Sequence, residues 1–153
     1  MKKIKIVKIT KAHLNDVYLF QKRNINEIGN NIWDEKEMKH LVESFLFYGC
    51  VYIDQNLVNA ICLAKKIDDY LELLSIYVDF SKRKKGVGSS MLKQCEIYCK
   101  ENHLKKILLE VNKDNKKAVR FYKTNGFLIS GKRDNYYDID GIKSDALLMN
   151  KKL

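Results

Sequence analysis

The sequence predicts an α+β fold: one mixed, mostly antiparallel sheet of six to seven strands, flanked by about four helices. Two observations support this prediction. The hydrophobic period switches along the chain between the alternation of strands and the 3.6-residue spacing of helices, in the order β-α-α-β-β-β-α-β-α-β-β. The length of 153 residues suits one domain with a substantial core and is short for two. We therefore expect a single domain over residues 1–153.

The first third of the chain predicts a strand followed by two helices. Residues 4–9 alternate as a strand, and apolar residues recur at helical spacing from Thr10 onward. Asp34 and Glu37 form a capping-box pattern, with Asp in place of Ser or Thr, which opens the second helix. We expect this helix to end at Gly49. Its apolar face would carry Met38, Leu41, Val42 and Phe45.

Three strands come next, separated by two short polar turns. The strands are expected over residues 50–54, 57–67 and 70–78. The turns between them are Gln55-Asn56 and Asp68-Asp69. Because no helix separates these strands, they supply the continuous β part of the predicted sheet.

The second half of the chain alternates helices and strands. A helical pattern begins at Gly86, and a short apolar run that contains Glu110 predicts a buried strand. A further helix stops at Asn125-Gly126, where glycine favours the left-handed conformation. The expected elements are a helix over 86–100, a strand over 106–111, a helix over 115–124, and strands over 127–133 and 144–151 that flank a loop with Asn135, Tyr136 and Tyr137.

The composition is that of a water-soluble protein, for which we expect the cytoplasm. Hydrophobic residues make up 46% of the chain and charged residues 31%. No apolar run approaches the roughly 20 residues of a membrane span, and Lys5 and Lys8 interrupt any signal-peptide core. The cysteines lack the spacing of a metal site, so we expect no metal and reduced, mostly buried thiols. They are Cys50, Cys62, Cys95 and Cys99.

The net charge of +10 has two explanations. It could serve an anionic partner. However, the chain has 25 lysines against four arginines and no proline, and its lysines are spread over the whole length. This composition is typical of an AT-rich genome. We therefore expect no specific nucleic-acid partner, although the positive field would favour an anionic cofactor.

The stretch over residues 83–89 reads Arg-Lys-Lys-Gly-Val-Gly-Ser and joins an apolar strand to a helix. Free N–H groups and the positive end of a helix bind anions at such a turn, and glycine lets a pyrophosphate approach the main chain. The Gly-Lys-Ser/Thr ending of a Walker loop is absent, and so is the third glycine of a dinucleotide fingerprint. On its own, the stretch fits a solvated basic helix start equally well.

The chain resembles the GNAT superfamily of N-acetyltransferases, most closely the RimI-type enzymes that acetylate ribosomal-protein N-termini. The cofactor loop of that superfamily runs Gln/Arg-x-x-Gly-x-Gly/Ala, which Arg83, Gly86 and Gly88 match. The resemblance extends over nearly the whole chain. Other matching stretches are residues 74–79 and 109–111, Asn115, Phe121-Tyr122-x-x-x-Gly126-Phe127, Arg133-x-Asn135-Tyr136-Tyr137 and residues 145–149.

This resemblance implies acetyl-CoA as co-substrate, lying in a splay between the central strands. The pantetheine arm would pair with the main chain of Ile76, Tyr77 and Val78. Its pyrophosphate would be held by Lys84, Lys85, Gly86, Val87, Gly88 and Ser89, in the loop that Arg83 begins. Asn115 would contact the cofactor near the thioester, Glu110 would act as a water-relayed base, and Tyr122 would act as an acid. Trp33, Tyr136 and Tyr137 would shape the peptide slot, and Glu72 is a reserve candidate for base or peptide contact.

The residue types also make chemical sense for acetylation of a protein N-terminus, such as that of a ribosomal protein. An α-amine has a pKa near 8 and lysine one near 10.4, so deprotonation at neutral pH costs about 1 kcal/mol for the first and about 4–5 kcal/mol for the second. A water-relayed carboxylate suffices for the α-amine. A phenol can protonate the departing sulfur.

Other interpretations stay open at this point. Glu110 could be a paired polar residue, Tyr122 could serve core packing, and Tyr136 could belong to an ordinary turn. The acceptor could be a small amine such as a polyamine or an aminoglycoside. The protein could also be a non-catalytic acetyl-CoA-binding module or a basic nucleic-acid adaptor. We expect a monomer or a weak dimer.

Overall fold

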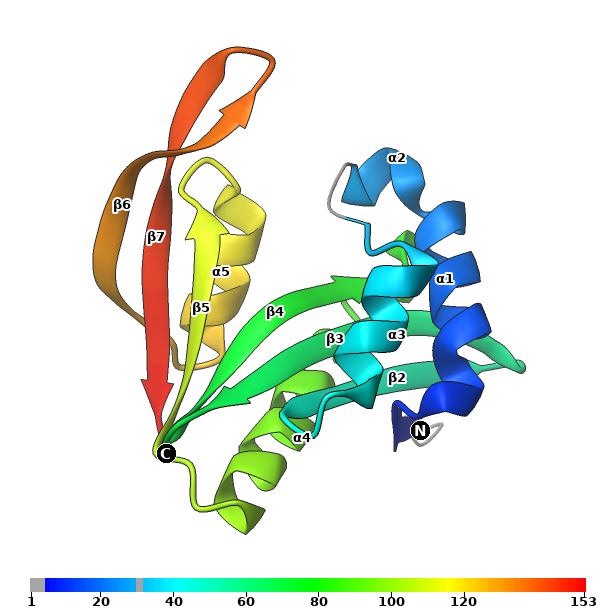
Figure 1. Cartoon of the computed structure of the whole chain (residues 1–153). Coiled ribbons are helices and arrows are strands. Elements are labelled where there is room, and N and C mark those ends of the chain that lie inside the picture. Colours follow the sequence, from blue (N-terminus) through cyan, green and yellow to red (C-terminus); the bar gives the residue numbers. More distant parts are fainter. Residues whose placement is uncertain (1–4, 30–31) are drawn as a thin grey trace.

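The computed structural model describes residues 5–29 and 32–153, and Figure 1 shows their arrangement. The sheet has seven strands in the order β1-β2-β3-β4-β5-β7-β6. The strands are β1 (Ile6–Lys8), β2 (Phe47–Asp54), β3 (Leu57–Ile67), β4 (Tyr70–Val78), β5 (Lys106–Asn112), β6 (Leu128–Ile139) and β7 (Ile142–Lys152). The helices are α1 (Leu14–Arg23), α2 (Ile25–Ile28), α3 (Glu35–Glu43), α4 (Val87–Glu101) and α5 (Lys116–Thr124), with short 3-10 turns at Lys11–His13 and Phe80–Lys82. The predicted α+β fold with one mostly antiparallel sheet is confirmed.

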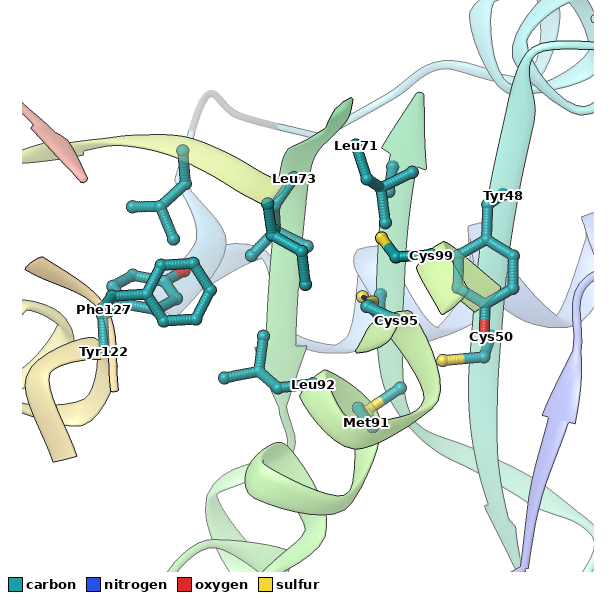
Figure 2. Close-up of a cluster of buried hydrophobic side chains, with 14 of the residues drawn as sticks. Tyr48, Cys50, Leu71, Leu73, Met91, Leu92, Cys95, Cys99, Tyr122 and Phe127 are labelled. Atoms are coloured by element: carbon teal, nitrogen blue, oxygen red, sulfur yellow. Dashed lines mark hydrogen bonds between the residues drawn. The ribbon is translucent and has the colours of Figure 1, made fainter. Parts of the chain in front are cut away.

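Two apolar clusters hold the helices on opposite faces of the sheet. α1 and α3 pack on one face through Phe20 and Met38. α4 packs on the other face, and α5 joins it there through Tyr122. Figure 2 shows this second cluster, in which Leu71 and Leu73 of β4 lie beside α4. All four cysteines are free and buried in it, as expected.

The turns of the first three large strands follow the sequence closely. Gln55 and Asn56 both have positive φ, 52° and 59°, and Asp68 has φ 46°. Left-handed residues suit a tight hairpin because their backbone twist matches that of the flanking strands. β2, β3 and β4 therefore form a continuous antiparallel unit.

β4 and β5 form the parallel pair of the sheet, and they stay together only briefly. Residues Tyr70 to Glu72 pair with Lys106 to Leu108. Beyond this point β4 has an irregular register with β3, between the pairs Leu63↔Ser75 and Ala64↔Leu73, while β5 continues beside β7. Such a bulge bends the strand that contains it. The C-terminal part of β4, beyond the bulge, therefore departs from β5, as Figure 1 shows.

The predicted end of the second helix is wrong. α3 stops at Glu43, Ser44 already has extended backbone angles, and Phe45 is 92% exposed instead of lying on an apolar helix face. Gly49 lies within β2. A Cβ atom there would come within 2.4 Å of the Phe47 ring. This glycine therefore permits close packing in a strand and does not end a helix.

One further prediction needs correction. Tyr136 and Tyr137 do not lie in a loop, because β6 continues to Ile139 and pairs with β7 on both sides of an irregular stretch between Arg133 and Tyr137. The described residues form five α-helices, which fits the expected number of about four; α2 has only four residues, too few to show a hydrophobic period. Ile4, which was expected in the first strand, lies outside the described residues.

Candidate active site

The loop before α4 forms a bare helix start. Gly86 is the N-cap residue with φ 78°, Lys84 has φ 57°, and within the described residues no side chain caps the helix. The first N–H groups of an α-helix have no partner inside the helix. With a helix of 15 residues behind them, these groups have the geometry that the predicted anion site requires.

Gly88 lets this helix start approach α5 closely. A Cβ atom at this position would lie 3.1 Å from the Phe121 ring and 3.7 Å from a methyl carbon of Val78. At 3.1 Å the Phe121 ring would have to shift by a few tenths of an ångström to admit a side chain here. The second glycine of the motif thus brings the cofactor loop, the end of β4 and α5 together.

The basic residues of the loop differ in their partners. Lys82 forms an ion pair with Asp54 at 2.9 Å, and the Lys85 amine donates to the Ser81 carbonyl at 2.8 Å. Arg83 donates from Nε to the Val78 carbonyl at 2.9 Å. Lys84 is exposed. Arg83, which belongs to the predicted cofactor-binding set, is therefore occupied by contacts to the protein.

Glu110 and Glu72 lie on the same face of the sheet. Along β5 the residues Ile107, Leu109 and Val111 are buried, and Glu110 is on the opposite side. Glu72 is in register with Leu108, which shares its face with Glu110. The Glu110 side chain is 25% exposed and accepts from Arg133 Nη2 at 2.9 Å. A carboxylate inside this apolar strand thus has a partner on β6.

Tyr122 of α5 lies in the second apolar cluster, where it makes an edge contact with Phe127 at 5.6 Å between ring centroids (Figure 2). Burial raises the pKa of Tyr122, with smaller contributions from Cys62 and Tyr137. Burial also raises the pKa of Tyr137, followed by the charge of Glu110. Both phenols are therefore protonated at neutral pH, as a phenol with the ordinary pKa near 10 also is. Tyr137 interacts electrostatically with both predicted catalytic residues.

The structure gives Asn115 and Trp33 definite local roles. The Asn115 side chain accepts from the Ala118 N–H at 3.1 Å and caps α5. The main chain of Trp33 bonds in both directions to the buried Gln21 side chain, at 2.9 and 3.0 Å. Its ring packs at the edge of the α1–α3 cluster. The predicted contacts of Asn115 with the cofactor and of Trp33 with the peptide remain predictions.

The aromatic pair Tyr136 and Tyr137 lies at the irregular stretch of β6, between Arg133 and Tyr137. Tyr136 is 51% exposed and meets Tyr137 edge to face at 5.1 Å. Asn135 has φ 51°, and its N–H donates to Asp145 at 3.0 Å. Asp145 also pairs with Lys113 at 2.8 Å. Neither Asp145 nor Arg133 was singled out from sequence, although both lie in stretches that resemble the GNAT superfamily.

Asp145 should make the stability of the hairpin depend on pH. The Lys113 hydrogen bond and the Asn135 N–H lower the pKa of Asp145 to about 2. A depressed folded-state pKa stabilises the protein above the ordinary Asp pKa of about 3.9, and this contribution disappears as the pH falls toward the folded value. We expect Asp145→Asn to lower Tm near pH 7, and the difference from the unaltered protein to shrink between about pH 4 and pH 2. Thermal melts followed by circular dichroism across this range test the expectation.

Asp134→Asn is the matched control for this experiment. Asp134 pairs with Lys132, as Asp145 does at 3.6 Å, but its side chain is 71% exposed. Exposed ion pairs contribute little to stability. A difference between Asp145→Asn and the unaltered protein that stayed constant from pH 7 to pH 2 would contradict the assigned role.

The comparison with known families identifies the class to which this protein belongs, the GNAT acetyltransferases. The model of the acetyltransferase (GNAT) family matches residues 14–127, most of the chain, and the chain therefore belongs to this family. The predicted resemblance is thereby confirmed.

Individual relatives include acetyltransferases of more than one kind. Streptothricin acetyltransferase A of Bacillus subtilis is 28% identical over 96 residues, which are 63% of this chain and 56% of that protein. The alignment thus spans little more than half of this curated relative. The crystal structure of the ribosomal-protein-S18-alanine N-acetyltransferase from Escherichia coli superposes with a TM-score of 0.85 at 21% identity, covering 98% of this chain and 94% of that one. Ard1 from Thermoplasma volcanium gives 0.80 at 26% identity, covering 97% of each chain.

No helix among the described residues is long and apolar enough to cross a membrane. Within residues 5–29 and 32–153, no group of three or more His, Cys, Asp or Glu side chains is arranged to hold a metal ion.

Proposed function

We propose that this protein transfers the acetyl group of acetyl-CoA to the α-amine of a protein N-terminus, such as that of a ribosomal protein, in the cytoplasm. The observation that carries this proposal is the parting of β4 from β5 beside the bare start of α4. The free edge of β4 after Glu72 exposes main-chain groups that can pair with an extended amide-containing arm. The N–H groups at the start of α4 supply the pyrophosphate site at the end of that arm.

Two side chains would accept and donate the protons of this reaction. As the amine nitrogen forms its bond to the thioester carbonyl carbon and the carbon–sulfur bond breaks, Glu110 would take the amine proton through a water molecule. Tyr122 would give its proton to the departing sulfur. The products are an acetamide and free coenzyme A. Direct transfer needs no cysteine, and the four thiols lie in the core.

The charge state of the site favours an α-amine acceptor over a lysine. Arg133 Nη2 lies 2.9 Å from Glu110 Oε1, so the carboxylate has a cation beside it. Such a group can orient water and accept one proton, but removing the proton of a lysine costs about 3–4 kcal/mol more at neutral pH than removing that of an α-amine. The exposed Tyr136 ring on β6 is suited to contact an extended peptide.

Acetylation of a small amine is the second candidate. The outer part of the β6–β7 hairpin carries Asp134, Asp138 and Asp140, all exposed, which could attract a polycation such as spermidine. The similarity to Streptothricin acetyltransferase A also supports a small-molecule acceptor.

Release of coenzyme A from acetyl-CoA, measured with matched acceptors, tests the proposal. One peptide set carries a free N-terminal Ala, Ser or Met, and the other is N-terminally blocked with internal lysines. We expect turnover only with the free N-termini. Turnover with spermidine and with neither peptide set would assign the second candidate. If saturating coenzyme A fails to raise Tm, where about 2.7 kcal/mol of stabilisation is expected at 100 times Kd, the cofactor site itself is wrong.

A further inference from the structure

Glu27 on α2 makes two contacts with residues far away in the sequence. Its carboxylate accepts from Tyr77 Oη at 2.9 Å and from Arg83 Nη2. The hydrogen bond from Tyr77, followed by that from Arg83, lowers the pKa of Glu27 below its ordinary value. The ionised Glu27 side chain thus links α2 to β4, through Tyr77, and to Arg83, the first residue of the predicted cofactor loop over residues 83–89.

Arg83 receives this contact in a fixed position. Its Nε donates to the Val78 carbonyl at 2.9 Å, and Nη2 donates to Tyr77 Oη at 2.8 Å. The guanidinium also lies 5.2 Å from the centroid of the Tyr77 ring and 5.5 Å from that of Phe80. The Tyr77 phenol accepts from Arg83 and donates to Glu27, so all three polar groups satisfy one another. Such a network defines one arrangement of its members.

The chain on either side of α2 is anchored to α1. Before α2, the Asn24 side chain donates to the Phe20 carbonyl at 2.9 Å. After it, Trp33 is held through its main chain by Gln21, which is 1% exposed. Glu27 adds a contact in a third direction, toward the cofactor loop. α2 therefore contacts β4 and Arg83 through Glu27, while Trp33, which follows it in the chain, is held by α1.

We propose that Glu27 is a positioning residue that couples α2 to the predicted cofactor loop, residues 83–89, through Arg83. This inference rests on the proposed function. Arg83 precedes Gly86 by three positions, in the loop whose N–H groups would bind the pyrophosphate. A loop fixed by a bound anion holds Arg83 in place, and the Arg83–Glu27 pair then holds α2. Coupling of this kind is reciprocal, so the position of α2 also influences binding at the loop.

Hydrogen exchange measured by mass spectrometry, with coenzyme A as the probe, tests this coupling in the full chain. The amides to follow at α2 are those of Glu27, Ile28 and Gly29, which donate within the helix. We expect saturating coenzyme A to slow exchange both at the start of α4 and at α2. In Glu27→Gln the slowing at α4 should remain, while the slowing at α2 should fall by about fivefold or more. A purely structural role would speed exchange at α2 equally with and without coenzyme A, leaving the ratio unchanged.

The controls separate this inference from the proposed function. Glu43→Gln removes another exposed glutamate of an ion pair, with Lys11 at 3.1 Å, and should keep both effects. Tyr77→Phe removes the phenol and keeps the Glu27–Arg83 pair, and should lose part of the slowing at α2. Slowing at α2 that is the same in Glu27→Gln and in the unaltered protein overturns the coupling alone. Absence of slowing at α4 in the unaltered protein overturns the proposed cofactor site and the coupling together.

Discussion

Replacing Tyr122 by Phe should lower kcat by about 10²- to 10⁴-fold, the range over which a positioned proton donor contributes to catalysis. Tyr122 is 8% exposed, and its phenol, whose pKa burial raises, is protonated at neutral pH, as is any phenol with the ordinary pKa near 10. The variant keeps the ring, and with it the packing against Phe127 and Phe121. We therefore expect the affinity for coenzyme A, measured by calorimetry, to stay within about twofold. Such a result would separate chemistry from cofactor binding.

Tyr98→Phe controls for the loss of a phenol from the same part of the molecule. Tyr98 lies on α4 and stacks on Tyr48 at 4.2 Å, within the apolar cluster that also contains Tyr122. It should retain nearly full activity. If Tyr122→Phe keeps kcat within about threefold of the unaltered protein, Tyr122 is a packing residue and the acid must be sought elsewhere. Equal losses in both variants would point to damage to the core.

Much of the fold follows from local signals in the sequence. The Asp34–Glu37 capping box is present in both directions, at 2.8 and 3.0 Å, and starts α3 as predicted. The left-handed turn at Gln55-Asn56 and the glycine stop at Gly126, with φ 87°, are equally local. Each of these features depends on a few neighbouring residues, and so their spacing was sufficient to predict them.

The misplaced elements depend on contacts that are distant in sequence. Helical spacing continues past Glu43, but Phe45 finds no core to enter and the chain joins the sheet instead, where Phe47 pairs with Lys65. The continuation of β6 through Tyr136 similarly requires β7 as its partner. Hydrophobic period alone could not decide either case, because tertiary pairing overrides local preference.

The candidate site likewise combines local features, which the sequence predicts, with contacts between distant residues, which it does not. The glycine loop and its helix could be predicted, since anion binding at a helix start requires only adjacent residues. The partner of Glu110 is on another strand, and the carboxylate that holds Arg83 is 56 residues away. Sequence reasoning therefore proposed the reacting groups but missed Arg133 as the partner of Glu110 and Glu27 as the partner of Arg83 and Tyr77.

Glu110→Gln should reduce kcat/KM by about 10²-fold or more at pH 7, with the loss becoming smaller as the pH rises toward 9. Gln can still accept a hydrogen bond from Arg133, which holds Glu110 at 2.9 Å, but it cannot take a proton. An α-amine with a pKa near 8 becomes neutral without help above that pH, so the need for a base declines there. The pH profile with a peptide acceptor measures this directly.

Glu72→Gln is the matched comparison, because Glu72 lies on the same face of the sheet and also has a carboxylate next to the splay. It should leave the pH profile of kcat/KM unchanged if Glu110 is the base. A loss confined to Glu72→Gln would transfer the role to that residue. Equal, moderate losses in both variants would mean that the proton leaves through water shared by two carboxylates, since removing one of two alternative routes leaves the other in use. The two variants together therefore assign the role of base to Glu110, to Glu72, or to water shared by both carboxylates.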